Sequence, residues 1–117
     1  MRYLLIVLLL SGCSTATYKP YSSFYGVGYQ DSKLSSDRFY VMYQGNGNST
    51  PLEVKNQFMH RSAEITKENG CSFFEVLTEA PGAKANGPVN WASHSGEIKI
   101  LKNATPKSFI ADEFLAK

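Results

Sequence analysis

The feature that most constrains the fold is one helix with clear start and stop signals. Thr50 is a good N-cap residue, Pro51 suits the first helical position, and Glu53, three residues after the cap, completes a capping box. Gly70 supplies the left-handed backbone position that commonly follows a last turn. The sequence therefore predicts a helix over residues 51–69.

This helix is amphipathic. At 100° per residue its apolar side chains gather on one broad arc, and its charged and amide side chains occupy the other. The apolar arc comprises Leu52, Val54, Phe58, Met59, Ala63 and Ile65, with Ser62 and Thr66 between them. We therefore expect the helix to lie on a sheet.

The clearest strand covers residues 37–43 (DRFYVMY), which are aromatic or β-branched and place Phe39, Val41 and Tyr43 on one face. Tyr40 and Met42 fall on the other face, so this strand is predicted to be covered on both sides or by a partner. It ends at residues 45–48 (GNGN), a strong turn signal.

Further strands are predicted over residues 24–30, 71–78 and 97–102. Residues 79–96 are rich in Pro, Gly, Ala and Asn and are predicted to form a long loop containing Trp91. A C-terminal helix is predicted from Thr105-Pro106 onward, with one stripe made of Phe109, Ile110, Phe114 and Leu115. The order β-β-α-β-β-α predicts a single α+β domain over residues 24–117, with helices packed on one antiparallel-dominated sheet.

The N-terminus reads as a signal peptide. Met1-Arg2-Tyr3 is short and basic, and Leu4 to Leu10 is a run of seven large apolar residues. A seven-residue helix rises about 10 Å against roughly 30 Å of bilayer hydrocarbon, so this run is too short to be a transmembrane helix. Leu10-Ser11-Gly12-Cys13 resembles the lipobox of bacterial lipoproteins.

That resemblance implies cleavage before Cys13, diacylglycerol on its sulfur and a further acyl chain on its amino group. Cys13 would then be a lipid anchor and unable to form a disulfide. Ser14 after the lipidated cysteine implies export to the periplasmic face of the outer membrane rather than retention in the inner membrane. Residues 13–23 are predicted to be the lipidated end and a polar tether.

The mature chain also resembles a family of small, uncharacterised proteobacterial lipoproteins. The likeness runs from Gly28-Tyr29 (GYQDSKLSSDRFYVMYQGN) through residues 61–70 (RSAEITKENG) to residues 73–76 (FFEV). It covers roughly half of the mature chain. The resemblance implies an envelope location and this fold, and it brings no catalytic residues with it.

Charge and motif content narrow the functional classes. Twelve basic residues against ten acidic ones are scattered along the chain, which disfavours a nucleic-acid binder. His60 and Glu64 are four residues apart, but two ligands do not make a metal site, so no metal and no cofactor beyond the lipid is predicted. His94 lies beside Ser93 and Ser95 without a nucleophile elbow, so no catalytic residue and no enzyme activity is predicted.

Five residues are candidates for structural or contact roles. Arg61 is predicted to form a partly buried charge pair with Glu64, which would hold the helix to the sheet. Trp91, Tyr25 and Tyr29 are candidates for contact with a partner, although Trp91 could equally fold back onto the core.

Cys71 is left as a lone thiol. It is either a small buried residue or one half of an intermolecular disulfide.

Together these features predict a lipid-anchored accessory or structural subunit of a cell-envelope assembly, with a protein partner and no small-molecule substrate. The alternative is a small module that binds or senses an envelope ligand such as peptidoglycan, using Trp91.

Overall fold

A computed structural model describes residues 20–22, 26–87 and 89–115. The predicted signal peptide, Cys13 and Tyr25 lie outside these residues. The described elements are, in chain order, β1 (Gly28–Lys33), β2 (Arg38–Gln44), α2 (Pro51–Glu68), β3 (Phe73–Asn86), β4 (Val89–Leu101), β5 (Phe109–Ile110) and α3 (Ala111–Leu115).

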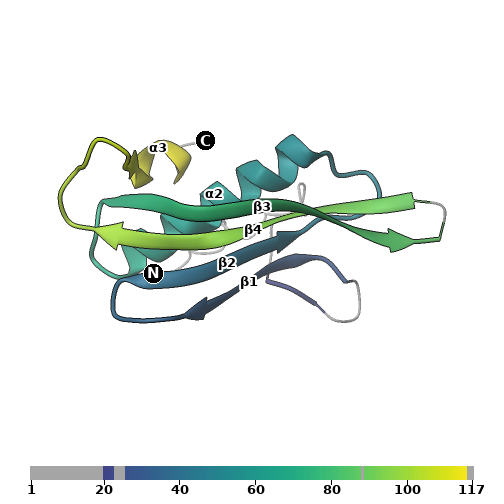
Figure 1. Ribbon diagram of the computed structural model, residues 1–117, viewed down its shortest axis with the longest axis horizontal. Helices are drawn as coiled ribbons and strands as arrows, with labels where there is room; N and C mark the ends of the chain where they lie inside the picture. Colours follow the sequence, from purple (N-terminus) through teal and green to yellow (C-terminus); the bar gives the residue numbers. More distant parts are fainter. Residues whose placement is uncertain (1–19, 23–25, 88, 116–117) are drawn as a thin grey trace, which may run out of the picture.

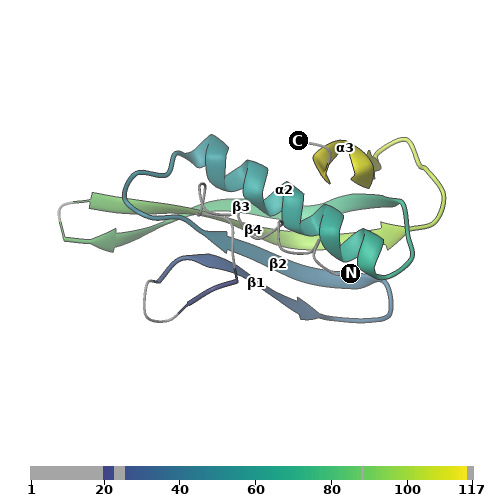
Figure 2. The ribbon, with the colours of Figure 1, turned by 180° about the vertical axis from the view of Figure 1, so that it is seen from behind.

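The strands form one sheet in the order β1-β2-β4-β3-β5, and every neighbouring pair is antiparallel. Helix α2 lies across one face of this sheet and α3 packs beside it, as the two opposite views in Figures 1 and 2 show. The α+β fold with helices on an antiparallel sheet is therefore confirmed. The opposite face of the sheet carries no described helix, and we call it the open face.

Helix α2 begins as its sequence signals predict. The Thr50 hydroxyl accepts the Glu53 N–H at 3.1 Å, and the Glu53 carboxylate accepts the Thr50 N–H at 2.9 Å, so both halves of the capping box are made. Gly70 adopts φ 77° two residues after the last helical residue, which is the conformation expected of a glycine after a helix.

The core lies between α2 and the sheet. Its largest fully buried apolar side chains are Phe58 and Val54 from the helix and Val41, Phe74 and Ile98 from the sheet. Ser62 and Thr66 are also fully buried, and each hydroxyl donates to a helix carbonyl four residues earlier, so their polar atoms are satisfied.

Leu52 is an exception to the predicted apolar arc, because 67% of its side chain is exposed. The buried arc at the helix start is set by Val54, and two residues correspond to 200° around a helix. Leu52 therefore points away from the sheet.

The predicted loop over residues 79–96 is wrong, because this segment is most of a long hairpin. Strands β3 and β4 pair without interruption from Glu79–Gly96 to Asn86–Val89, and Figure 1 shows the hairpin projecting beyond the rest of the sheet. Gly87 at φ 70° opens the two-residue turn, as hairpins of this length require. The small, exposed side chains on the β3 half of this arm give no alternating pattern, so the sequence did not signal a strand.

A bulge interrupts the hairpin nearer the core. The register shifts between Val76 and Thr78, and there β3 comes so close to Gly96 that a Cβ on this glycine would lie 2.1 Å from the Thr78 carbonyl oxygen. Beyond Phe74, the outer edge of β3 pairs with no described strand, because β5 reaches only Phe73 and Phe74. Pro81 lies within this free edge.

The C-terminal helix starts later than predicted. Residues 105–108 form a turn in which Ser108 exchanges hydrogen bonds with the backbone of Thr105, at 2.9 and 3.0 Å, and this local pairing competes with a helix start. The next two residues form β5, which is an additional strand, and the helix begins only at Ala111. Ile110 is consequently exposed rather than part of the apolar stripe.

The edge of the sheet at β1 also differs from the prediction. The strand runs from Gly28 to Lys33 rather than over residues 24–30, because its polar second half pairs with β2 at the edge of the sheet without needing apolar side chains. Residues assigned to the tether reach the sheet as well, since Pro20 bridges to Tyr29 and Ser22 to Val27. Among the described residues, no helix is both long enough and apolar enough to cross a bilayer.

Candidate functional site

No described helix covers the open face of the sheet. On β2, Phe39, Val41 and Tyr43 are buried beneath α2, whereas Tyr40 is 42% exposed on the other side. Within the described part of the chain this strand is covered on one face only, which leaves the predicted alternative, that a partner covers the other face, as a prediction.

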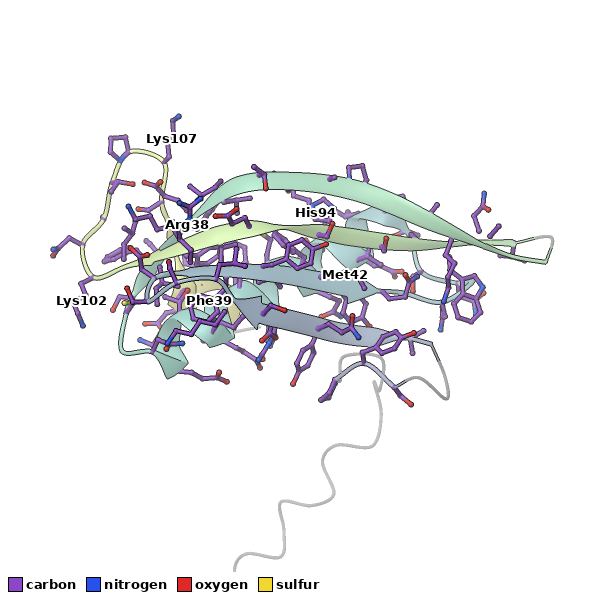
Figure 3. The ribbon with its side chains drawn as sticks, turned by 60° about the horizontal axis from the view of Figure 1, so that its bottom comes forward. Arg38, Phe39, Met42, His94, Lys102 and Lys107 are labelled. Carbon is purple, nitrogen blue, oxygen red and sulfur yellow. The ribbon has the colours of Figure 1, made fainter. Side chains whose placement is uncertain are left out.

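Strand register assigns the neighbours of Tyr40. It pairs with Glu97 on β4 and with Ser32 on β1, while Met42 pairs with Ser95. Since directly paired residues lie on the same face of a sheet, Tyr40 and Met42 form an aromatic and thioether centre surrounded by polar side chains. Figure 3 shows Met42 along β2, with β4 beside it.

Charged residues border this centre on one side. Arg38 forms an ion pair with Glu97, and in the register Lys99 lies between Arg38 and Glu75. Glu75 in turn accepts a hydrogen bond from the Thr105 hydroxyl. The open face therefore combines a small apolar centre with alternating charges.

Trp91 sits at the far end of the open face, and its surroundings answer whether it is exposed or packed. It is half-buried, and the Lys84 ammonium lies 5.3 Å from the centroid of its ring. A Cβ on Gly47 would lie 3.3 Å from the indole nitrogen, so the ring packs against the loop after β2. Trp91 therefore braces the projecting hairpin and is not a freely exposed contact residue.

Arg61 is placed between the helix and the edge of the sheet. Its guanidinium bonds Asp31 of β1 at 2.7 Å and Glu64 at 3.0 Å, and it reaches Glu68 at 3.6 Å. It also stacks over the Tyr29 ring, 4.3 Å from the centroid. The predicted pair with Glu64 is present, and Asp31 is the partner that ties the helix to the sheet.

The electrostatics of this cluster favour the charged guanidinium. Burial lowers the pKa of Arg61, but hydrogen bonds to Asp31 and Glu64 outweigh that effect and hold the pKa above its ordinary value. The side chain is only 13% exposed, so its charges are screened less than those of a surface pair. Tyr29, predicted as a possible partner contact, lies beneath this guanidinium and is half-buried.

The two histidines are both engaged within the fold. His60 contacts the Phe114 carbonyl oxygen at 2.9 Å through Nδ1 and Glu64 at 3.4 Å through Nε2. His94 is buried, contacts Glu79 at 2.7 Å and lies 5.0 Å from the Phe58 ring. Because successive side chains of a strand alternate, His94 faces the helix while its neighbouring serines face the open side, so they do not form one site.

Cys71 is buried, with 8% of the residue exposed, and forms no disulfide with another described residue. It belongs to the core cluster that also contains Ala63 and Phe74. Of its two predicted alternatives, this position matches the small buried residue.

No three His, Cys, Asp or Glu side chains gather as metal ligands would, within residues 20–22, 26–87 and 89–115. Comparison of the chain with family models, with curated proteins and with solved structures finds no match. The resemblance to a lipoprotein family stays a prediction, and function is inferred from residues and geometry.

Proposed function

We propose that this protein is a lipid-anchored, non-catalytic subunit of a cell-envelope assembly, and that it docks a protein partner on the open face of its sheet. The observation that carries the proposal is this face itself. A helix layer covers one side of the sheet, while the other presents Tyr40 and Met42 among alternating charges.

The anchor side of the proposal depends on Cys13 and on where the chain joins the sheet. If Cys13 carries lipid, residues 13–19 separate it from Pro20, which already bridges to β1. Seven residues extend to at most about 25 Å. The domain would therefore lie close to the periplasmic surface of the outer membrane, and its partner would have to reach it there.

The alternative of a ligand-binding module built on Trp91 has less support. Its indole is packed against the loop after β2 and lies beneath Lys84, so little of the ring is available for a glycan or peptide.

Photo-crosslinking in the native lipidated protein tests the docking face. A photoreactive amino acid in place of Tyr40 should give one stoichiometric protein adduct in cells, and the same group in place of Asn56, on the exposed side of α2, should not. Equal adducts from both positions, or none from Tyr40, would contradict docking on the open face. In a pull-down with the same protein, retention on isolated cell wall without a protein partner would favour the alternative function.

Mass spectrometry of the purified protein tests the anchor separately. The proposal expects an amino terminus at Cys13 that carries diacylglycerol and a further acyl chain. An uncleaved, unmodified terminus would remove the envelope location.

A further inference from the structure

Exposed lysines gather at the end of the sheet opposite the projecting hairpin. Lys33 is the last residue of β1, and Lys102 and Lys107 lie in the loop that follows β4. Figure 3 shows Lys102 and Lys107 on this loop, with the hairpin at the other end of the molecule. We call this part of the protein, residues 33–38 and 102–107, the basic end.

The two segments of the basic end lie side by side. The Ile100 N–H, near the end of β4, donates to the Asp37 carbonyl oxygen at 2.8 Å. Arg38 and Lys99 are also direct partners in the register of β2 and β4. The lysines of both segments therefore belong to one surface.

The three lysines are exposed and lack carboxylate partners. Among the residues that the structure describes, no carboxylate forms an ion pair with Lys33, Lys102 or Lys107. Lys102 contacts the Gly70 carbonyl oxygen at 3.4 Å, which leaves its charge uncompensated. Three ammonium groups are therefore available to an anionic surface.

Carboxylates near this end are bound by neighbouring groups. Glu97 forms its ion pair with Arg38, and Glu75 and Asp37 each accept a hydrogen bond from a hydroxyl group. In the helix layer, Asp112 of α3 pairs with a lysine of α2 at 3.2 Å. The exposed charge that the turn after β1 and the loop after β4 add is therefore positive.

Leu34 adds an apolar side chain to the basic end. It follows Lys33 directly, and 54% of it is exposed. Lysines beside an exposed leucine suit the boundary between lipid headgroups and acyl chains, where the leucine is taken out of water and the ammonium groups meet phosphates. A small anion in solution would make no use of this leucine.

The described chain enters the sheet from the side of the basic end. The Tyr21 N–H donates to the Tyr29 carbonyl oxygen at 2.8 Å, and the next residue, Ser22, donates its N–H to the Val27 carbonyl oxygen at 3.0 Å. From one residue to the next, the chain thus moves along β1 in the direction away from Lys33.

The proposed anchor lies within reach of the basic end. Pro20 bridges to Tyr29, which is four residues and therefore about 13 Å along the strand from Lys33. Residues 13–19 extend to at most about 25 Å from Pro20. A lipid on Cys13 and the basic end would therefore both meet one membrane surface.

We propose that the basic end rests on anionic phospholipid headgroups of the membrane that holds the anchor. The inference rests on the proposed lipid anchor, and it adds a second contact that determines which end of the domain faces the membrane. Each lysine at an anionic surface strengthens such a contact about fivefold. With this end on the membrane, the strands stand upright and the open face points sideways, accessible to a partner.

Fluorescence quenching with the native lipidated protein tests the contact. The protein is placed in vesicles of phosphatidylcholine, with or without phosphatidylglycerol, that also contain a lipid with a nitroxide on its headgroup. A dye is attached to a cysteine introduced by Ser36→Cys at the basic end or by Ala85→Cys on the hairpin. Labelling is selective, because Cys13 would carry lipid and Cys71 is buried.

We expect the dye at residue 36 to be quenched more strongly when phosphatidylglycerol is present, and the dye at residue 85 to be quenched little in either vesicle. Equal quenching at residue 36 in the two vesicles, or stronger quenching at residue 85, would overturn the proposal. High salt should remove the part that depends on phosphatidylglycerol, since it screens exposed charges, and insensitivity to salt would also count against the contact.

Two paired variants localise the contact. Replacing both Lys102 and Lys107 by glutamine should lower the ratio of docked to undocked protein about 25-fold, at about fivefold for each lysine. Replacing both Lys55 and Lys84 by glutamine removes the same charge outside the basic end and should leave the ratio unchanged. Equal effects of the two paired variants would refute the site.

Flotation of the same vesicles separates this inference from the proposed function. Protein that does not float with the lipid lacks the anchor, which contradicts the proposed function and this inference together. Protein that floats but shows no quenching dependent on phosphatidylglycerol contradicts this inference alone.

Discussion

Replacing Arg61 with alanine removes the contact that ties α2 to the edge strand β1. The hydrogen-bonded ion pair with Asp31 contributes about 1.5 kcal/mol, the low end for a charged pair because both groups retain some exposure. The helix pair with Glu64 adds about 0.5 kcal/mol, and stacking over Tyr29 adds about 1 kcal/mol. We therefore expect Arg61→Ala to lower the free energy of unfolding by about 3 kcal/mol.

Urea denaturation followed by far-UV circular dichroism measures this loss. The matched control is Lys55→Ala on the same helix, because Lys55 reaches Glu79 only at 3.8 Å and its side chain is 48% exposed. This control should cost less than about 0.5 kcal/mol. Arg61→Lys keeps the charge but loses the planar fork, so it should recover about half of the loss.

A double-mutant cycle with Asp31→Asn shows whether the loss arises from the contact between helix and strand. The reasoning requires a coupling free energy of about 1 kcal/mol or more between Arg61 and Asp31. Additive effects of the two substitutions, or an Arg61→Ala cost no larger than that of Lys55→Ala, would show that the ion pair does not hold the helix to the sheet.

Three other predictions concern the hairpin and the core. Gly96→Ala places a methyl group 2.1 Å from the Thr78 carbonyl oxygen, so we expect a loss of about 3 kcal/mol in urea denaturation, and an unchanged midpoint would mean that the bulge opens freely. Cys71 is buried, so the native protein should run as a monomer on a non-reducing gel, whereas a dimer band removed by reductant would reveal an accessible thiol. Trp91 is half-buried beneath Lys84, so its fluorescence should be only partly quenched by acrylamide, and quenching equal to that of free tryptophan would contradict the packing.

The sequence predicted those helices and strands whose start and end depend on interactions among a few neighbouring residues. Thr50, Glu53 and Gly70 define helix α2 because a cap and a left-handed C-terminal position depend on neighbouring backbone groups alone. The alternation around Val41 likewise identified β2. These signals were enough to predict the α+β fold class and the face of α2 that packs on the sheet.

The β3–β4 hairpin could not be predicted in the same way. The β3 half of its outer part is exposed, and side chains such as Ala80, Gly82 and Ala83 give no periodic pattern. Pairing there depends on the backbone ladder and on a two-residue turn at Gly87. A segment rich in small residues and proline has the composition of a loop. Gly87 was the informative signal, because it marks a turn.

The functional surfaces depend on contacts between distant segments. Asp31 is thirty residues from Arg61, and their meeting follows from the register of an edge strand that the sequence places too early. The loop after β2 likewise lies close to the first turn of α2, which Gly45 permits, because a Cβ there would lie 2.7 Å from a methyl of Val54. Neither arrangement is visible in a local pattern.

The outer edge of β3, which pairs with no described strand beyond Phe74, has a consequence under the proposed lipid anchor, which would concentrate the protein on a membrane surface. Molecules fixed to one membrane meet far more often than in solution, and an exposed strand edge invites them to join into a continuous sheet. Pro81 has no amide hydrogen to offer a neighbouring strand, and the bulge between Val76 and Thr78 breaks the straight row of donors and acceptors. This edge therefore resists polymerisation at densities at which a regular strand would seed fibres.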